Sequence, residues 1–328
     1  MTRIAINGSL LFVTVAGLVS AADSLSGPVA GYIAGSPKAE LRAILGVPGS
    51  FLFSDPLSLP DGISIIRMAP GQDFALVERR RGGAAAMVLG GGAVDHVTPL
   101  EGVMATAGWA VFSLGGRSAV LCSSTSDRLQ VVTGLPDAPQ LALDLDAALF
   151  PEPPVTAALS DDGSLVLVAS SRSVYLLSQA ATPQLLMSGG RIGALAVLRN
   201  GKDAVAVDRS TGSVHLLEGA ASAPTPRVLV SGLDEPGQVF PSPDGKTLFL
   251  ATPGRLTVSW IDLASGEVHP SEPPGADAVA PVDLMPLRSR DTFLISARPR
   301  QPAWIFYRDG NVGHVVFVPA VSTKESVR

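Results

Sequence analysis

Arginine is the residue type whose spacing first suggests chemistry in this chain of 328 residues. It recurs at intervals of roughly 45 residues, singly or in short groups. The residues concerned are Arg79, Arg80, Arg81, Arg128, Arg172, Arg209, Arg255, Arg298 and Arg300. A guanidinium group combines a permanent charge with a planar fork of N–H donors that matches carboxylate and phosphate groups. If the fold gathers these arginines on one face, they form a candidate site for an anionic ligand.

Acidic residues recur in a similar way and offer a second interpretation. They are Asp55, Glu101, Asp144, Asp146, Asp234, Glu235 and Asp277. The two sets are about equally numerous, so we expect most of the arginines to pair with these acids, with little gain in stability from exposed pairs. Arg79 to Arg81 are the best candidates for unpaired charges, because three successive cations cannot all find partners easily.

The elements that must position these residues are revealed by an internal repeat. Two apolar stretches joined by a turn occur six times, and a third apolar stretch follows each pair. The turns are marked by Gly71, Gly116, Gly163, Gly201, Gly245 and Arg290, in steps of 45, 47, 38, 44 and 45 residues. In several repeats a second turn, such as Asp309-Gly310, leads to a fourth stretch. Each repeat therefore predicts four short antiparallel strands, which we name a to d in chain order.

Four strands in about 44 residues are typical of one blade of a β-propeller, in which strand a lines the central channel. Stacked blades cover both faces of the middle strands, which should therefore be continuous apolar runs. Leu165–Ala169 and Leu248–Ala251 are such runs. The b–c and d–a loops of a propeller share one face. The arginines fall in b–c loops and the acids in d–a loops, so the arginines are predicted to surround one mouth of the channel.

The N-terminal part departs from this repeat. Tyr32 to Leu45 matches a c–d hairpin, but no a–b pair precedes it. Either this hairpin closes a six-bladed ring by adding to the last blade, which we expect, or it forms a stunted seventh blade. The predicted organisation is a signal peptide at 1–22, a closure hairpin and linker at 23–62, an all-β propeller of six four-stranded blades at 63–320, and a C-terminal tail at 321–328.

The fifth repeat carries a family resemblance. Ser242-Pro-Asp-Gly-Lys246, Leu248–Ala251, Val258–Asp262 and the Ser265-Gly266 turn together resemble a blade of YVTN-type propellers, a broad group that includes NHL and WD-repeat relatives. No repeat contains the Tyr-Val-Thr-Asn tetrad that gives the group its name. The resemblance implies a propeller fold and a secreted binding scaffold of bacterial type, and it implies no chemistry.

Residues that could serve a metal or a catalytic triad do not converge in this scheme. His96, His269 and His314 fall in d strands and His215 in a c strand, away from the channel, whereas metal ligands must meet within a few ångströms. The glycines after Leu89 lack the Lys-Ser/Thr pair and the helix of a phosphate-binding loop. The sequence therefore predicts no catalytic residues, no metal ligands and no cofactor.

Composition and targeting signals narrow the function classes. Hydrophobic residues make up 46% of the chain, charged residues 16%, and mean hydropathy is +0.35, values that exclude a disordered chain. A formal net charge of −5 gives no basic field for nucleic acid. Arg3, the apolar run Leu10–Val19 and the small residues after it predict a cleaved signal peptide, hence a secreted or periplasmic protein without a membrane span. Cys122 is the only cysteine, and its apolar neighbours predict that it is buried.

The functional hypothesis is a secreted or periplasmic β-propeller that acts as a non-catalytic binding module. We expect a monomer whose partner is another protein or a small anionic ligand. The alternative is a propeller hydrolase, similar to lactonases, that uses carboxylates at the channel mouth and a divalent cation.

Overall fold

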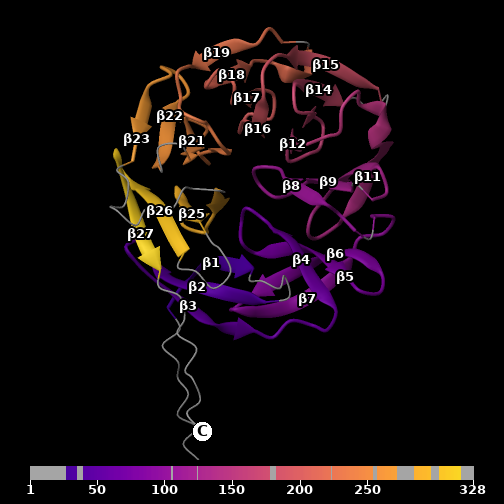
Figure 1. Ribbon diagram of the computed structural model, residues 1–328. Coiled ribbons are helices and arrows are strands. Elements are labelled where there is room, and N and C mark those ends of the chain that lie inside the picture. Colours follow the sequence, from indigo (N-terminus) through magenta and orange to yellow (C-terminus); the bar gives the residue numbers. More distant parts are fainter. Residues whose placement is uncertain are drawn as a thin grey trace, which may run out of the picture.

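The computed structural model describes residues 27–34, 40–104, 106–123, 125–177, 182–222, 224–253, 257–271, 284–296 and 303–318. Within these ranges the chain forms seven antiparallel sheets, arranged radially as a ring (Figure 1). The helices there are two short 3-10 turns, η1 (Ala147–Leu149) and η2 (Ala220–Ser222). None of these helices has the length and apolar character that a membrane crossing requires. The predicted all-β propeller is confirmed.

Six of the sheets have four strands, paired in chain order, and we number them blades 1 to 6. Blade 1 comprises β4 (Ile63–Met68), β5 (Phe74–Arg79), β6 (Gly83–Gly90) and β7 (Ala93–Pro99). Blade 2 comprises β8 (Trp109–Phe112), β9 (Ala119–Ser123), β10 (Arg128–Thr133) and β11 (Gln140–Asp146). Blade 3 comprises β12 (Thr156–Leu159), β13 (Val166–Ala169), β14 (Ser173–Leu177) and β15 (Pro183–Ser188).

The second half of the ring continues in the same way. Blade 4 comprises β16 (Ile192–Val197), β17 (Ala204–Asp208), β18 (Ser213–Leu217) and β19 (Arg227–Val230). Blade 5 comprises β20 (Val239–Pro241), β21 (Thr247–Thr252), β22 (Thr257–Asp262) and β23 (Val268–Pro270). Blade 6 comprises β24 (Met285–Pro286), β25 (Thr292–Ser296), β26 (Ala303–Asp309) and β27 (Val312–Val318).

The seventh sheet, the N-terminal blade, has three strands: β1 (Val29–Ala34), β2 (Leu41–Val47) and β3 (Ser50–Leu57). The expectation that the N-terminal hairpin adds to the last blade is therefore wrong, and the alternative of a stunted seventh blade is the one the structure has. The reason is local. Residues 50–57, predicted as linker, turn back directly after β2 and supply it with a third strand.

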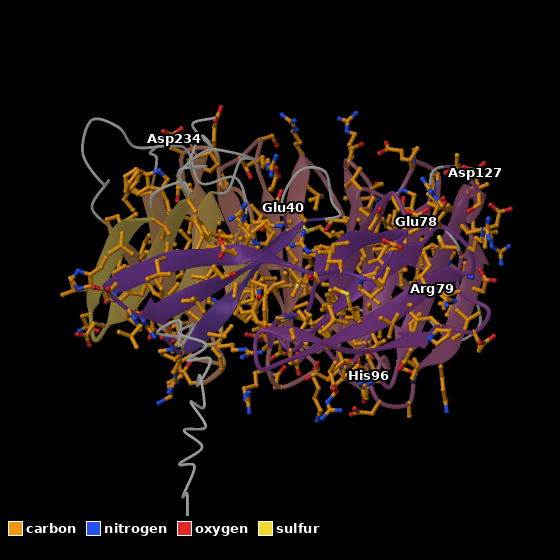
Figure 2. The ribbon with its side chains drawn as sticks, turned by 90° about the horizontal axis from the view of Figure 1, so that it is seen from below. Glu40, Glu78, Arg79, His96, Asp127 and Asp234 are labelled. Atoms are coloured by element: carbon orange, nitrogen blue, oxygen red, sulfur yellow. The ribbon has the colours of Figure 1, made fainter. Side chains whose placement is uncertain are left out.

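The N-terminal blade lacks the innermost strand of its neighbours. The residues that line the central channel come from β4, β8, β12, β16, β20, β24 and adjoining loops, and none of the described ones belongs to β1–β3. Glu40, at the β1–β2 connection, lies toward the same face as Glu78, near the end of β5, and Asp127 of the β9–β10 loop, whereas His96 lies toward the other face (Figure 2). Strands β1 to β3 thus occupy places b, c and d, and the predicted c–d hairpin is a b–c pair.

Turn residues from both neighbouring blades close the edge that the missing strand leaves open. The Arg288 N–H of blade 6 donates to the Ala30 carbonyl over 2.7 Å. From blade 1, the Gln72 side chain accepts from the Tyr32 N–H at 2.7 Å and donates to the Pro286 carbonyl at 2.9 Å. Buried backbone groups need such partners, so these contacts let three strands complete the ring.

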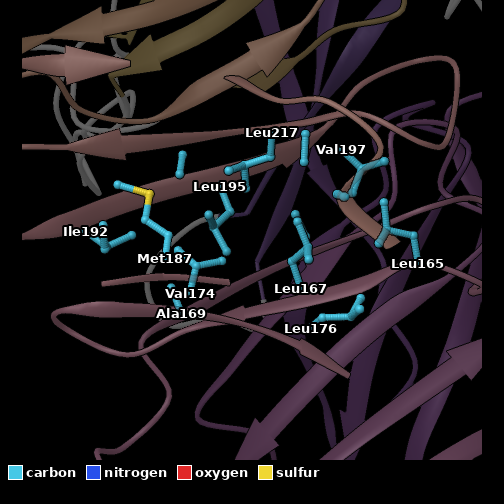
Figure 3. Close-up of a cluster of buried hydrophobic side chains, with 14 residues drawn as sticks. Leu165, Leu167, Ala169, Val174, Leu176, Met187, Ile192, Leu195, Val197 and Leu217 are labelled. Carbon is cyan, nitrogen blue, oxygen red and sulfur yellow. The ribbon is translucent and has the colours of Figure 1, made fainter. Parts of the chain in front are cut away.

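The core is divided into seven apolar clusters, one at each contact between neighbouring sheets. Figure 3 shows the cluster between blades 3 and 4, where Leu167 and Met187 of blade 3 meet Leu195 and Leu217 of blade 4. Strands β9, β17 and β21 are buried along their whole length, as predicted for middle strands. Cys122 in β9 is buried, which confirms the prediction for it.

Candidate functional site

The innermost strands enclose a channel cavity of about 340 Å³. Its lining includes the apolar residues Val111, Leu159, Ala196 and Phe240, although polar atoms contribute more of its exposed surface than apolar atoms do. The charged residues of the described lining are Arg67 and Arg209, and no carboxylate belongs to it. A cavity that combines apolar side chains and cationic donors with no carboxylate in its described lining favours an organic anion over a cation.

Arg209 reaches the channel because a glycine makes room for it. A Cβ added to Gly193 of β16 would lie 2.3 Å from Nε of Arg209 and 2.7 Å from its Cγ and Cδ. Any larger residue at position 193 would occupy the space of the arginine side chain. The backbone at Gly193 is not left-handed, so side-chain space rather than backbone geometry requires glycine here.

The backbone around Arg209 is held by its neighbour Asp208, which is 3% exposed at the end of β17. The Asp208 carboxylate accepts from the Arg191 N–H at 3.0 Å, the Ser210 N–H at 2.9 Å and the Ser210 hydroxyl at 2.7 Å. Burial alone would raise the pKa of Asp208, but these hydrogen bonds outweigh it and lower the pKa to about 2. The Arg209 N–H also donates to the Arg191 carbonyl. These hydrogen bonds fix the backbone of the loop that presents Arg209, and Asp208 stays negatively charged beside it.

The channel widens on the opposite face into a funnel of about 1170 Å³. The a–b turns of the blades surround this funnel, and Pro70, Leu114, Leu159, Phe240 and Pro286 line both the funnel and the channel. The two spaces are thus continuous.

The four carboxylates of the funnel are already bound within the fold. Hydrogen bonds reach Asp161 from Gly115, Asp162 from Ser160 and Ser164, Asp244 from Ser242 and Arg290, and Asp291 from Arg308. The second oxygen of Asp291 is buried without a hydrogen bond in the described structure. Hydrogen bonds from Ser160 and Ser164 lower the pKa of Asp162, so it stays ionised.

Three cationic side chains of the funnel form no ion pair with these acids in the described part of the chain. Arg199 and Lys202 flank the β16–β17 turn of blade 4 and are exposed. Arg288 donates to the Gln72 carbonyl at 2.9 Å and lies 5.4 Å from the centre of the Tyr32 ring, so its role is to close the N-terminal blade.

The predicted arginine ring is only partly assembled. Arg209 alone among its described members lines the channel. Arg128 pairs with Asp144 at 2.5 Å, as the pairing hypothesis expected. Arg172 is exposed on its b–c loop. Arg255, Arg298 and Arg300 lie outside the described residues, as does the acid Asp277.

Arg79 to Arg81 occupy the b–c loop of blade 1, away from the channel lining. Arg79 donates to the Gly82 carbonyl, and its Nε is buried without a hydrogen bond in the described structure. Arg80 and Arg81 are exposed, and no described carboxylate pairs with them within 4.0 Å. Of the acids suggested as partners for the arginines, Asp55 lies within strand β3 and not in a d–a loop. Asp146, another of the acids, caps η1 instead, accepting from the Ala148 N–H.

The histidines lie where the repeat placed them, in β7, β18, β23 and β27. Over the described ranges, no three His, Cys, Asp or Glu side chains gather closely enough to hold a metal ion.

Sequence reasoning missed Arg67, Arg199 and Lys202. A signal for Arg67 was present, because it interrupts the apolar run Ile63–Met68 in an innermost strand, where a charge needs a polar surrounding. Arg199 and Lys202 flank the Asn200-Gly201 turn and look like ordinary solvated turn residues. Only the closed ring of blades places that turn beside the channel.

Comparison with known proteins supports the fold alone. No family model and no curated protein matches the sequence. Among solved structures, a functionally unknown protein from Desulfotomaculum acetoxidans is similar over 89% of this chain and 100% of its own, with a TM-score of 0.58 and 14% identity. A candidate 6-phosphogluconolactonase from Bacteroides fragilis is similar over 88% of this chain and 92% of its own, with a TM-score of 0.57 and 13% identity.

A protein from Lactobacillus plantarum gives a TM-score of 0.56 at 14% identity, covering 89% of this chain and 95% of its own. These likenesses, together with the radial sheets, define the fold of the chain as a β-propeller. Identities this low carry no activity across.

Proposed function

We propose that this protein is a non-catalytic β-propeller that binds a small organic anion in its central channel. The observation that carries the proposal is the side chain of Arg209, which lies over Gly193 in a channel whose described lining contains no carboxylate. Arg67 adds a second positive charge to the same lining. A carboxylate in the channel would form a charge-assisted hydrogen bond with Arg209 while its apolar body contacts the inner strands.

The alternative of a lactonase-like hydrolase needs carboxylates that converge on a divalent cation. In the described residues the funnel carboxylates are spread over the turns of blades 3, 5 and 6, and each is held by donors of the protein. The two candidate lactonases among the similar structures, from Bacteroides fragilis and Bacteroides uniformis, support the fold of this alternative and no more.

Three further parts of the proposal come from the sequence. The blade-like motif of the fifth repeat supports membership of the YVTN/NHL group. The apolar run Leu10–Val19 supports a cleaved signal peptide and a secreted or periplasmic location. A soluble binding module with its ligand enclosed in the channel is consistent with both and needs no second copy of the chain.

The test is calorimetric titration of the protein with octanoate, an anion with an apolar body, in low-salt buffer. We expect saturable binding that Arg209→Ala weakens at least tenfold, because a hydrogen bond to a charged group contributes about 1.5–3 kcal/mol. Arg172→Ala, which removes an exposed b–c arginine outside the channel, is the matched control and should bind normally. Octanamide, which lacks the charge, should bind more weakly than octanoate.

Equal affinity of the wild type and Arg209→Ala would overturn the proposal, as would the absence of saturable octanoate binding. Hydrolysis of glucono-δ-lactone that depends on added Ca²⁺ or Mg²⁺ would favour the hydrolase instead.

A further inference from the structure

Blade 4 supplies a cation at each end of the same inner strand. Arg209 lies over Gly193, near the start of β16, and Arg199 follows two residues after the end of this strand. Strands rise about 3.3 Å per residue, so the six steps from residue 193 to residue 199 span about 20 Å. Between the two ends, Ala194 to Val197 of the strand contribute apolar residues to the channel lining.

The turn that presents the second cation is rigid. The Asn200 side chain accepts from the Lys202 N–H at 3.0 Å and the Asp203 N–H at 2.9 Å, and it donates to the Asp203 carboxylate at 2.6 Å. The same Asp203 carboxylate accepts from the Gly219 N–H at 2.7 Å. Arg199 and Lys202 are therefore held on either side of a fixed turn at the rim of the funnel.

The two cations that flank this turn have no carboxylate partner in the described structure, unlike the cations beside Asp244 and Asp291. Asp244 is matched by Arg290 at 2.8 Å and Asp291 by Arg308 at 2.5 Å. The hydrogen bonds to Asp161 and Asp162 come from serine hydroxyls and backbone N–H groups of blades 2 and 3. Arg199 and Lys202 of blade 4 form no ion pair with a carboxylate in the described structure, and both line the funnel that continues into the channel.

We infer that the ligand of the channel is an elongated dianion with acidic groups at its two ends and an apolar middle, the chemistry of a long-chain α,ω-dicarboxylate. One carboxylate is bound by Arg209 at the channel end, and the other by Arg199 and Lys202 at the funnel. The methylene chain lies along the apolar inner strands. This inference rests on the proposed anion binding and names the ligand class for that site.

The experiment compares dodecanoate with dodecanedioate, two chains of equal length that differ only in the second carboxylate. In low-salt titrations we expect the diacid to bind at least tenfold more tightly than the monoacid. Succinate, which is too short to reach both ends, should show no such preference over butyrate. Between suberate and dodecanedioate, affinity should rise by up to about fourfold for each methylene that the channel buries.

Variants at the two ends of the proposed site test which residues bind each carboxylate of the ligand. Arg199→Ala/Lys202→Ala should reduce dodecanedioate affinity to that of dodecanoate and leave dodecanoate unchanged. Lys246→Ala removes an exposed lysine from the neighbouring a–b turn, outside the funnel lining, and should change neither affinity. Arg209→Ala should weaken both ligands.

The outcomes separate this inference from the proposed function. If dodecanoate binds through Arg209 but the diacid is no tighter, or if its advantage survives in the Arg199→Ala/Lys202→Ala protein, the dianion inference is wrong and channel anion binding stands. If neither acid binds the wild type, both are wrong.

Discussion

Replacing Gly193 by alanine separates the placement of Arg209 from its charge. The added Cβ would lie 2.3 Å from Nε of Arg209, far inside van der Waals contact, so the arginine side chain has to leave its place over β16. The arginine itself, its charge and the net charge of the protein are unchanged. Loss of its hydrogen bond to a bound carboxylate corresponds to about 1.5–3 kcal/mol, or about 10- to 100-fold in the dissociation constant.

Stability should change little in this variant. Arg209 is exposed and flexible enough to move, and alanine in a strand is more favourable than glycine by about 0.5–1 kcal/mol because the unfolded chain loses less freedom. The assay is octanoate titration beside urea unfolding. Gly189→Ala is the matched control, since a Cβ at this position meets no atom within 4 Å.

A double-mutant cycle makes the result decisive. In the Arg209→Ala background, Gly193→Ala should cause no further loss of affinity, because the side chain that it displaces is gone. The reasoning is refuted if Gly193→Ala binds octanoate like the wild type, or if it weakens binding equally with and without Arg209.

Further consequences concern the ring closure, an acid-sensitive loop, the buried thiol and the b–c face. Gln72→Ala removes the partner of the buried Tyr32 N–H and should lower the free energy of unfolding by about 1–3 kcal/mol in urea titrations. Asp208 has a pKa of about 2 when folded against 3.8 as a model group, so its contribution of about 2 kcal/mol is present above pH 4 and is lost as the pH falls toward 2. Burial raises the pKa of Cys122 to about 11, with the charge of Asp127 adding to the effect, so a thiol reagent should label the native protein far more slowly than the unfolded one. Wild type should bind citrate or heparin weakly at low salt through Arg80 and Arg81, and replacing residues 79–81 with alanine should abolish that binding without loss of stability.

Each of these four predictions would be contradicted by a specific result. Gln184→Ala, at an exposed position, controls for the Gln72 change, and equal unfolding energies of the two variants would contradict the closure role. Asp208→Asn should flatten the acid limb of the stability curve, so an unchanged limb speaks against the hydrogen-bonded carboxylate. Rapid labelling of native Cys122 would show that β9 is accessible. Heparin binding that survives in the triple variant would place the anion contact elsewhere.

The repeat in the sequence was sufficient for the class of fold and for the contents of each blade. Strands with apolar residues in succession, such as Val166–Ala169, could only be covered on both faces, and turns at Gly163 or Gly245 marked where neighbouring strands reverse. The same patterning placed Cys122 in a buried strand, His96, His269 and His314 in outermost strands, and His215 in a third strand. Strand burial and turn position depend on residues close together in the chain, so the sequence of a single repeat is enough to predict them.

Tertiary structure alone decided how the ring closes and which cations meet. Gln72 bonds to Tyr32 and to Pro286, 40 and 214 residues away, and the N-terminal blade needs both contacts because it has no innermost strand. The sequence offered nine arginines in six b–c loops, yet among those described only Arg209 lines the channel, where Gly193 leaves space for it above an inner strand. Repeat position determines the face on which a side chain lies. Whether it points into the channel depends on the volume of residues on adjacent strands, and that is settled only when the sheets have packed.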